Sequence, residues 1–526
     1  MNISKKISIL GAGQAGAYAA NEIRKHDKEI EITIFSNENY LPYERPPLSK
    51  DNIIGKKNYD ELSFFSNDFY NTENIQIINQ AVREVDFEKK ILTTEDSHCE
   101  IYDSLLITTG SKNKKLNFGE NKEDLNKGIL YLRDIEDSKR IKEAIDTHTS
   151  FAIVGGGFIG LEIASSISQL GKVAHIIEMG SHLMGRVIPK QISALVSNYH
   201  EKRGNSILLN TNIVSIQKLH NKYQIELNNN QQILVDFIIA GIGSTPNVEL
   251  FKNSTLKLNN GIVTDEFCRT SEKDVFAAGD VANFFHPFYN KQMRLESYQH
   301  AQNQGIAAAK NILGLNLPYK QIPWMWSDQF DLNLQLIGDC NDFDQEVQRG
   351  DSLEDGIIYF FIKNKKIMGA CGIGIAGKVG RDIKLAGKIS ENHIEIDNRL
   401  CWFLGRLDKN YGDNAIYVHL KRDLDKVAES FSQRFYYKRG ISLAYKYNLL
   451  RTKQISGKSD IEICRDLIKT CEENILFFLK NKSKFKKIDV ENFREGIKKF
   501  WAFIDAEGDL NSALRELEIK RNMTNK

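Results

Sequence analysis

The sequence predicts an α/β protein, and three features support this class. Two segments share one order of elements, KISILGAGQAGAYAANEIRK from residue 6 and FAIVGGGFIGLEIASSISQLG from residue 151. Each reads as an apolar strand, a glycine-rich turn and an amphipathic helix, and each is followed by another apolar strand. In addition, YDSLLITTGS (102–111), VDFIIAGIGSTPN (235–247) and VFAAGD (275–280) read as strands that end in turns. With 526 residues, the chain has room for about three or four domains.

The glycine spacing of both turns is typical of dinucleotide binding. The first glycine allows the tight turn, the second lets the backbone approach a pyrophosphate, and the third lets helix pack against strand. The helix N-terminus then presents free N–H groups and a partial positive charge to the anion. The glycines are Gly11, Gly13 and Gly16 in the first turn and Gly155, Gly157 and Gly160 in the second. Because each turn lies between an expected strand and an expected helix, the sequence predicts two dinucleotide sites.

Two such sites in one chain are useful only if their reactive rings can meet. One dinucleotide is then a diffusible hydride donor, and the other is a bound flavin that stores the electrons. None of the seven cysteines forms a CxxC pair, which favours a reducing compartment and argues against a zinc site and a dithiol relay. Without a relay, the flavin would pass its electrons directly to an outside acceptor.

A carboxylate near the end of the second strand of such a unit usually binds a ribose hydroxyl. In the second unit Glu178 ends VAHIIE, 18 residues after Gly160, and it would repel the 2′-phosphate of NADPH. We therefore expect NADH to be preferred, although Arg186 lies nearby. In the first unit the strand ends at Ser36, and the carboxylate of Glu38 comes two residues later. The spacing alone does not decide which unit binds which dinucleotide.

Composition and charge argue against other classes of protein. The 41% hydrophobic and 27% charged residues are ordinary for a globular protein, and the net charge of +2 favours neither nucleic acid nor a membrane. No apolar run reaches the ~18 residues of a membrane span. We expect no signal peptide, because the chain enters a strand at once. From residue 400 onward, 26 basic residues stand against 18 acidic ones, and the pattern becomes mainly helical.

The stretch YLPYERPPLSK (40–50) holds three of the chain's eight prolines beside Arg45 and Lys50. Pro46 and Pro47 each fix φ, so the loop is set in place before any ligand binds. A rigid wall beside a flat ring would be useful, because an error of an ångström in hydride geometry is costly. An exposed basic loop with turn prolines is the alternative interpretation.

Together with the two glycine turns, this loop makes the chain resemble the NADH-dependent FAD ferredoxin reductases of oxygenase systems. This is the putidaredoxin reductase and biphenyl dioxygenase reductase type, to which apoptosis-inducing factor is related. The matching motifs recur in the family's order over roughly residues 5 to 390; they are GAGQAG, LPYERPPLSK, ILYLRDIED, GGGFIGLE, IGSTPN, VFAAGDVA, RLESYQHAQNQG and PWMWSDQFDLNLQLIG. LPYERPPLSK and WMWSDQFDL are the most specific of them.

The resemblance implies a glutathione-reductase-like fold with two dinucleotide-binding domains, a small α+β C-terminal domain and an extra, mainly helical extension. Residues 1–115 and 243–322 would form an interrupted FAD domain, and residues 116–242 would bind NAD. Residues 323–398 would form the C-terminal reductase domain. The basic extension, 399–526, has no counterpart in the family.

The resemblance also implies a set of site residues. Lys50 and Glu162 would form the catalytic pair beside flavin N5, where the lysine charge stabilises the anionic reduced ring without carrying a proton. The positions that match FAD contacts are Gly11, Gly13, Gly16, Glu38, Arg45, Lys50, Val82, Arg133 and Asp280. Those near the flavin and nicotinamide rings are Glu296, Ser297 and Trp326. Those of the NAD set are Gly157, Phe158, Ile159, Gly160, Glu178, Arg186 and Gly243.

Simpler interpretations stay open for several of these residues. Trp324 and Trp326 could be core residues of the third domain, and Asp280 could cap a following helix. The basic and aromatic YYKRG in the extension would suit nucleic acid, an acidic ferredoxin or an anionic membrane surface. A helical appendage with a solvated basic face is the simplest interpretation of that extension.

We therefore predict a cytoplasmic FAD enzyme that oxidises NADH and passes electrons to a small iron–sulfur protein, ferredoxin or rubredoxin, which serves an oxygenase or a P450. The acceptor rests on the resemblance alone. The alternatives are an NADH–quinone reductase held at a membrane surface and a redox-responsive interaction protein like apoptosis-inducing factor. No specific nucleic acid partner and no metal are expected, and the sequence leaves a homodimer open.

Overall fold

The computed structural model of the protein describes residues 5–116, 128–364, 366–375, 377–390, 417–421, 423–432, 459–489, 492–503, 510 and 514. The chain divides into two compact units, residues 1–393 and 394–526, and each is described by itself. Within the described residues, no helix combines the length and the apolar character needed to span a bilayer.

The first unit starts with a parallel sheet in the order β19–β7–β1–β2–β3. Leu10 at the end of the central strand pairs with Phe35 on one side and Ile107 on the other, so these strands end level with one another. The edge strand comes from much later in the chain, with Val275 opposite Leu105. The strands are β1 (Lys6–Leu10), β2 (Glu31–Phe35), β3 (Ile75–Ile78), β7 (Ser104–Ile107) and β19 (Val275–Ala277).

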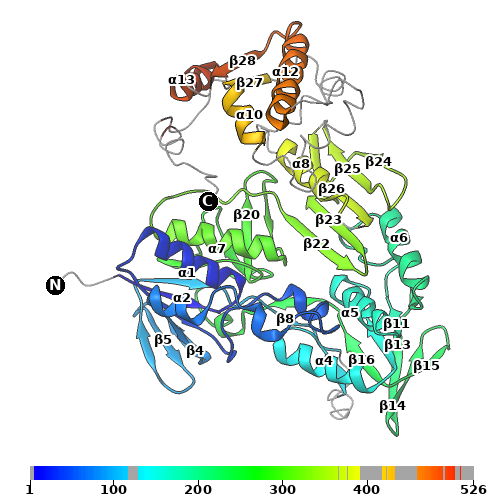
Figure 1. The fold of residues 1–526 in the computed structure, drawn as a ribbon. Helices are drawn as coiled ribbons and strands as arrows, with labels where there is room; N and C mark the ends of the chain where they lie inside the picture. The colour runs from blue at the N-terminus through cyan, green and yellow to red at the C-terminus, as the bar shows by residue number, and fades with distance from the viewer. Residues whose placement is uncertain are drawn as a thin grey trace. The chain divides into compact units, whose positions relative to one another are not determined.

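Helices α1 (Gln14–His26) and α7 (Tyr298–Ile312) lie side by side on this sheet (Figure 1). Their backbones approach closely because α1 is rich in alanine and α7 carries Gly305 at the crossing. A Cβ on Gly305 would lie 2.3 Å from the Ala15 carbonyl oxygen. A short helix, α2 (Asn67–Thr72), packs against β3.

A second parallel sheet follows in the order β12–β11–β10–β16–β9. Its central strand β10 is followed by the glycine turn and by helix α5, as the sequence predicts. The strands are β9 (Ile129–Leu130), β10 (Ser150–Val154), β11 (Val173–Ile177), β12 (Ser206–Leu208) and β16 (Phe237–Ala240). The helices that accompany them are α4 (Ile135–Thr147), α5 (Phe158–Gln169) and α6 (Lys190–Glu201).

The chain passes between the two parallel sheets twice, and the two crossing segments pair with each other. The crossing strands are β8 (Ser111–Asn113) and β17 (Ser244–Pro246), which run antiparallel with Thr245 opposite Lys112. This pairing brings the ends of β7 and β16 together, and both strands end in the turns that the sequence predicts.

The third large sheet is antiparallel, in the order β22–β23–β26–β25–β24, with helix α8 (Gly380–Ser390) packed on β26 and β23. Its strands are β22 (Trp324–Gln329), β23 (Leu332–Gly338), β24 (Gln345–Arg349), β25 (Ile357–Lys363) and β26 (Lys366–Ile375). The first hairpin turns at Phe330 with φ +56°, and helix α5 contacts strand β22. The hairpin β22–β23 therefore packs against helix α5, which accompanies the second parallel sheet.

Smaller elements complete the first unit. The three-stranded sheets are β4 (Val82–Asp86) with β5 (Ile91–Thr94) and β6 (Cys99–Ile101), β13 (Ile213–Leu219) with β14 (Lys222–Leu227) and β15 (Gln232–Val235), and β18 (Ile262–Thr264) with β20 (Ala282–His286) and β21 (Lys291–Met293). The 3₁₀ turns are η1 (Pro46–Ser49), η2 (Tyr59–Leu62) and η3 (Glu249–Phe251).

The described part of the second unit is mainly helical, as expected, but it also contains a strand pair that the sequence reading missed. Strands β27 (Tyr417–Lys421) and β28 (Phe485–Asp489) run parallel. The helices are α10 (Leu424–Ser432), α12 (Asp460–Leu479) and α13 (Phe493–Phe503). A small core of Ala428, Ile463, Cys464 and Leu467 joins α10 to α12. The YYKRG motif and Cys401 lie outside the described residues.

Candidate active site

In the first glycine turn, the outer glycines are packed and the middle one is open. A Cβ on Gly11, where φ is +116°, would lie 2.4 Å from the Thr108 carbonyl oxygen. A Cβ on Gly16 would lie 2.2 Å from the Gly11 carbonyl oxygen, whereas a Cβ on Gly13 would have nothing within 4 Å. Helix α1 begins here without a side-chain cap and without an acidic residue in its first turn. The turn therefore leaves space and free N–H groups for an anion at Gly13.

The second glycine turn repeats this arrangement. A Cβ on Gly155 would lie 2.5 Å from the Gly241 carbonyl oxygen, and one on Gly160 would lie 2.4 Å from the Gly155 carbonyl oxygen. The nearest atom to a Cβ on Gly157 is 3.9 Å away. Helix α5 likewise starts without a side-chain cap or an early acid, and Ile159 in its first turn is exposed. Phe158 packs inward against the core.

Glu178 lies across this second turn, as its spacing predicts. Its Oε2 accepts a hydrogen bond from the Gly156 N–H at 2.7 Å, and its Oε1 accepts one from the Gly180 N–H at 2.6 Å. Both carboxylate oxygens are thus fixed beside the turn. Arg186 approaches Gly243 at the end of β16, where a Cβ would lie 3.4 Å from its Nη2. The second turn is therefore bordered by one carboxylate and one guanidinium group.

Glu38 and Arg45 form an ion pair beside the first turn. Arg45 Nη2 lies 2.5 Å from Glu38 Oε1, the Tyr43 hydroxyl donates to Glu38 Oε2, and Arg45 Nη1 donates to the Arg133 carbonyl oxygen at 2.5 Å. Burial raises the pKa of the Tyr43 hydroxyl, which keeps it a donor. The loop 40–50 is thereby tied to the segment that precedes α4.

Asp280 follows β19, and the next element is strand β20, so Asp280 does not cap a helix and the helix-cap interpretation is wrong. Its Oδ2 accepts a hydrogen bond from Ser111 Oγ at 3.1 Å and lies 3.7 Å from Arg133 Nη2. Burial raises the pKa of the Asp280 carboxyl, Arg133 opposes that shift, and Glu296 adds to it. Burial also lowers the pKa of the Arg133 guanidinium. These groups form a partly buried polar cluster at the ends of strands β7 and β19.

Glu296, Ser297 and Trp326 lie at the start of α7 and on β22. Arg294 Nη1 lies 2.5 Å from Glu296 Oε1, and Ser244 also donates to Glu296. Ser297 caps helix α7 and its Oγ donates to the Trp324 carbonyl oxygen at 3.3 Å. The rings of Trp324 and Trp326 stack with centroids 5.1 Å apart, and both are half-buried. They form a partly exposed aromatic edge and are not fully buried core residues.

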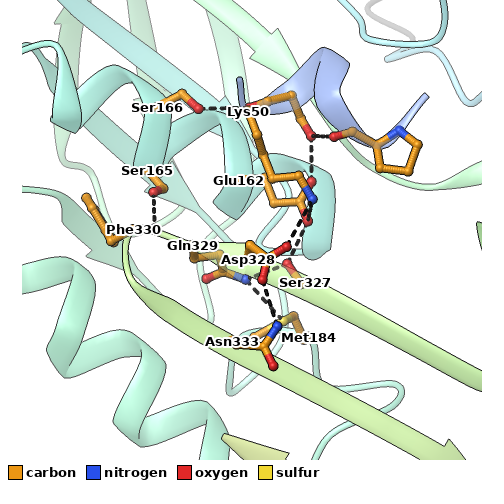
Figure 2. A network of polar contacts seen from close by, with 12 residues as sticks. Lys50, Glu162, Ser165, Ser166, Met184, Ser327, Asp328, Gln329, Phe330 and Asn333 are labelled. Carbon is orange, nitrogen blue, oxygen red and sulfur yellow. Dashed lines mark hydrogen bonds and ion pairs between the residues drawn. The ribbon is translucent and has the colours of Figure 1, made fainter. Parts of the chain in front are cut away.

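Lys50 is not an exposed loop residue. Its Nζ lies 3.5 Å from Glu162 Oε1 and 3.8 Å from Asp328 Oδ2, and its side chain is 17% exposed (Figure 2). Glu162, on α5, also accepts hydrogen bonds from Ser49 Oγ at 2.5 Å and Ser327 Oγ at 2.7 Å. One buried ion pair thus lies where the loop 40–50, helix α5 and the β22–β23 hairpin meet.

Val82 is placed apart from these groups. It begins β4, opposite Thr94, and packs at the edge of the core around Leu10 and Phe35. No polar group of the site contacts its side chain in the described interactions, so its contribution there would be limited to packing or to its backbone.

The sequence reading missed several polar residues of the site, among them Ser49, Ser111, Arg294, Ser327 and Gln329. Ser327 and Gln329 had a detectable signal. They stand two apart on a strand whose other face carries the tryptophans, so they face the core together, and they are 0% and 2% exposed. Buried polar residues need partners, which is a reason to look for a network at such a pair.

Comparison with known proteins agrees with this architecture. The model of the family described as pyridine nucleotide-disulphide oxidoreductase matches residues 5–305, and the one described as reductase C-terminal matches residues 324–400. The chain belongs to the pyridine nucleotide-disulphide oxidoreductase family. This confirms the predicted fold with two dinucleotide-binding regions and the prediction of an NAD(P)H-dependent flavoprotein oxidoreductase.

Individual relatives are ferredoxin and rubredoxin reductases. The chain is 34% identical to the 3-phenylpropionate/cinnamic acid dioxygenase ferredoxin–NAD(+) reductase component of Photorhabdus laumondii, over 75% of this chain and 98% of that protein. It is 33% identical to rubredoxin–NAD(+) reductase of Ectopseudomonas oleovorans, over 65% and 88% of the two chains. The crystal structure of the ferredoxin reductase for the CYP199A2 system of Rhodopseudomonas palustris matches with a TM-score of 0.68 and 29% identity, over 72% and 94%.

The family name mentions a disulphide, but this chain has no CxxC pair. Among the described residues, no disulfide involves Cys99, Cys268, Cys340, Cys371, Cys464 or Cys471. Burial raises the pKa of Cys268 and Cys371, so these thiols are poor nucleophiles. The described part of the site therefore offers no dithiol between a flavin and an acceptor.

Proposed function

We propose that this protein transfers electrons from NADH through FAD to a small iron–sulfur protein, ferredoxin or rubredoxin, that serves an oxygenase or a P450. The observation that carries the proposal is the buried Lys50–Glu162 pair. It joins the loop after β2, a strand of the first parallel sheet, to helix α5, which follows β10 of the second parallel sheet. A cation thereby lies where two dinucleotide-binding units meet, and the sequence has no CxxC pair that could carry the electrons instead.

The residues present fit both dinucleotides. For FAD, the open turn at Gly13 and the uncapped start of α1 would receive the pyrophosphate, and Glu38 and Asp280 would bind ribose and ribityl hydroxyls. When bound, the flavin accepts a hydride and gives up electrons one at a time. The chain contributes Lys50, which offsets negative charge next to it, and Glu162, which keeps that ammonium in position. Residues 1–115 and 243–322 would form the FAD domain, and residues 116–242 the NAD domain.

NADH preference over NADPH follows from Glu178. One of its oxygens accepts from the Gly156 N–H of the turn and the other from the Gly180 N–H, so the carboxylate cannot swing away easily. A 2′-phosphate placed next to it would meet a fixed negative charge, whereas a ribose hydroxyl can donate to it. Arg186 lies on the other side, near Gly243, and would pair with the pyrophosphate.

The nature of the acceptor is supported by the names of the relatives, which are reductases of ferredoxin or rubredoxin. An NADH-consuming enzyme with free thiols suits the cytoplasm. The residues 323–398 would form the reductase domain beside the aromatic edge of Trp326. The extension 399–526 would be an appendage to this electron-transfer body.

Stopped-flow absorbance of the purified FAD protein tests the proposal. NADH should bleach the flavin in one turnover, and oxidised ferredoxin or rubredoxin should restore the yellow colour faster than a soluble quinone does. If only the quinone, or neither, reoxidises the flavin, the proposed acceptor is wrong. A protein that does not retain FAD after reconstitution would refute the whole proposal.

The role of Lys50 has a matched control seven residues later in the chain. Lys57 pairs with Glu44 at the same 3.5 Å separation but is more exposed. Lys50→Met should slow flavin reduction by about tenfold or more, as expected when a charged partner worth ~1.5–3 kcal/mol is lost. Lys57→Met should leave the rate unchanged. Equal effects of the two substitutions would remove the assignment.

A further inference from the structure

A chain of buried side chains leads away from the Lys50–Glu162 pair. Ser327 Oγ donates to Glu162 Oε1 at 2.7 Å, and Gln329 Nε2 donates to Ser327 Oγ at 3.1 Å (Figure 2). Beyond them, Gln329 Oε1 lies 2.9 Å from His200 Nε2, and His200 Nδ1 lies 3.1 Å from Asn205 Nδ2. All five residues are less than 9% exposed. The chain links α5, β22, α6 and the segment before β12.

The hydrogens along this chain can point in one direction only. Glu162, opposite an ammonium group, accepts, so the single hydroxyl hydrogen of Ser327 must be directed to it. Ser327 Oγ is then free to accept, and Gln329 must offer its NH₂ group. The amide oxygen of Gln329 consequently faces His200, whose Nε2 must carry the hydrogen.

The far end of the chain agrees with this direction. Burial lowers the pKa of His200 to about 4, so the imidazole is neutral at neutral pH and carries one ring hydrogen. Asn205 Nδ2 can only donate, which makes His200 Nδ1 the acceptor and leaves the hydrogen on Nε2. Every donor from Asn205 to Ser327 therefore points toward the Glu162 carboxylate. Such aligned bonds strengthen one another in a dry interior.

The chain matters because Lys50 has a second carboxylate within reach. Its Nζ is 3.5 Å from Glu162 and 3.8 Å from Asp328, whose side chain is 46% exposed. A cavity of about 440 Å³ borders both Lys50 and Asp328, so the lysine has room to move between them. What keeps Glu162 turned toward the lysine is its fixation on both oxygens, by Ser49 on Oε2 and by Ser327 on Oε1.

We infer that Asn205, His200 and Gln329 act through Ser327 as a positioning chain that holds Glu162 toward Lys50 and keeps the lysine from pairing with Asp328. This inference rests on the proposed role of Lys50 beside the flavin. It assigns to helix α6, which supplies His200, a part in setting the charge at the reacting centre. These residues act through Glu162.

The first test compares substitutions of two buried glutamines of one hairpin. Gln329→Met removes both hydrogen bonds of the chain. Gln335→Met is the control, because Gln335 is 8% exposed on β23 and is also bonded at both ends, to Trp324 and Asn333. Ser327→Ala removes only the last link of the chain. The double variant Ser327→Ala/Gln329→Met shows whether the two residues act as one unit.

Two measurements on the FAD-loaded protein report on the position of Lys50. Trace acetylation followed by mass spectrometry gives the labelling of Lys50 relative to Lys57. That ratio should rise at least about threefold in Gln329→Met and Ser327→Ala, because Lys50 moves to the more exposed Asp328. The two-electron midpoint potential should fall by about 30 mV, which corresponds to a tenfold change in the equilibrium constant.

The double variant should show no more change than Ser327→Ala alone, and Gln335→Met should show none. Effects of Gln329→Met and Ser327→Ala that add, or a Gln329→Met protein with the parent labelling ratio and potential, would overturn the inference. An equal response of Gln335→Met would also overturn it, since the effect would then be general loosening of the hairpin. The labelling ratio of Gln329→Met and Ser327→Ala could change as expected while Lys50→Met keeps the midpoint potential of the parent. This result would support the positioning chain and refute the proposed role of Lys50.

Discussion

The contrast between the glycines of the first turn makes a sharp prediction. Gly16→Ala would place a Cβ 2.2 Å from the Gly11 carbonyl oxygen, and real Cβ contacts stay beyond 3.0 Å, so α1 must move off the sheet by about 0.8 Å. Overpacking of this kind costs about 1–3 kcal/mol of folding free energy. Gly13→Ala meets nothing within 4 Å, and φ of −81° is ordinary for alanine. It should leave the apoprotein unchanged or up to ~1 kcal/mol more stable.

For flavin binding, Gly13→Ala should be the more damaging of the two substitutions. A methyl group on residue 13 occupies the space through which a pyrophosphate would approach the free N–H groups of α1. Loss of one charge-assisted hydrogen bond costs about 1.5–3 kcal/mol, which weakens FAD binding by roughly tenfold to more than a hundredfold. Gly16→Ala should weaken FAD binding less than Gly13→Ala while lowering stability more.

Urea unfolding of the apoprotein and fluorescence titration with FAD measure the two quantities separately. The pair Gly157→Ala and Gly160→Ala provides the matched experiment in the second turn, where the corresponding contacts are 3.9 and 2.4 Å. Gly157→Ala should weaken NAD⁺ binding and leave FAD retention intact. The reasoning fails if Gly13→Ala binds FAD as tightly as the parent, or if it destabilises the apoprotein as much as Gly16→Ala.

Three further predictions follow from the site. Glu178→Ala should reduce the preference for NADH over NADPH by about tenfold or more in kcat/KM, and an unchanged ratio would show that this carboxylate does not select the cofactor. Between pH 6.5 and 4, His200 is protonated in the unfolded chain but stays neutral in the folded protein, where burial lowers its pKa to about 4. Lowering the pH through this range should therefore remove about 3 kcal/mol of folding free energy that a His200→Gln variant does not lose. If the unfolding free energies of the two proteins, measured with urea, change in parallel with pH, the prediction is wrong. Alkylation at pH 7 should modify exposed Cys99, spare buried Cys268 and leave electron transfer intact, and loss of transfer with one modified thiol would reveal a relay.

The parts of the fold that the sequence could predict are those with a local cause. Both glycine turns follow from spacing, and the strand at Val275 follows from a short apolar run that ends in glycine and Asp280. From the sequence alone, the loop 40–50 could be an exposed turn or a wall of the site. Only the contact of Lys50 with Glu162, 112 residues away, decides between these interpretations. The resemblance to a family, which rests on the same loop, supplied that pairing in advance.

The parts that could not be predicted depend on tertiary contacts. His200 meets Gln329 across 129 residues, and nothing in the amphipathic pattern of α6 marks one histidine as the end of a network. The strand pair β27–β28 was missed because each strand has only five residues, in a unit whose other described elements are helices. Short strands gain their stability from the partner, and the partner of Tyr417 is Phe485.

The position of β19 at the edge of the first sheet has a consequence for biosynthesis. All strands of the second sheet lie between residues 129 and 240, so that unit can close before Val275 has left the ribosome. The sheet that starts the chain must wait for its last strand and for α7, which covers α1. The region translated first is therefore completed after the region inserted into it. A nascent chain whose first 260 residues have left the ribosome would carry a complete second parallel sheet beside an incomplete first one.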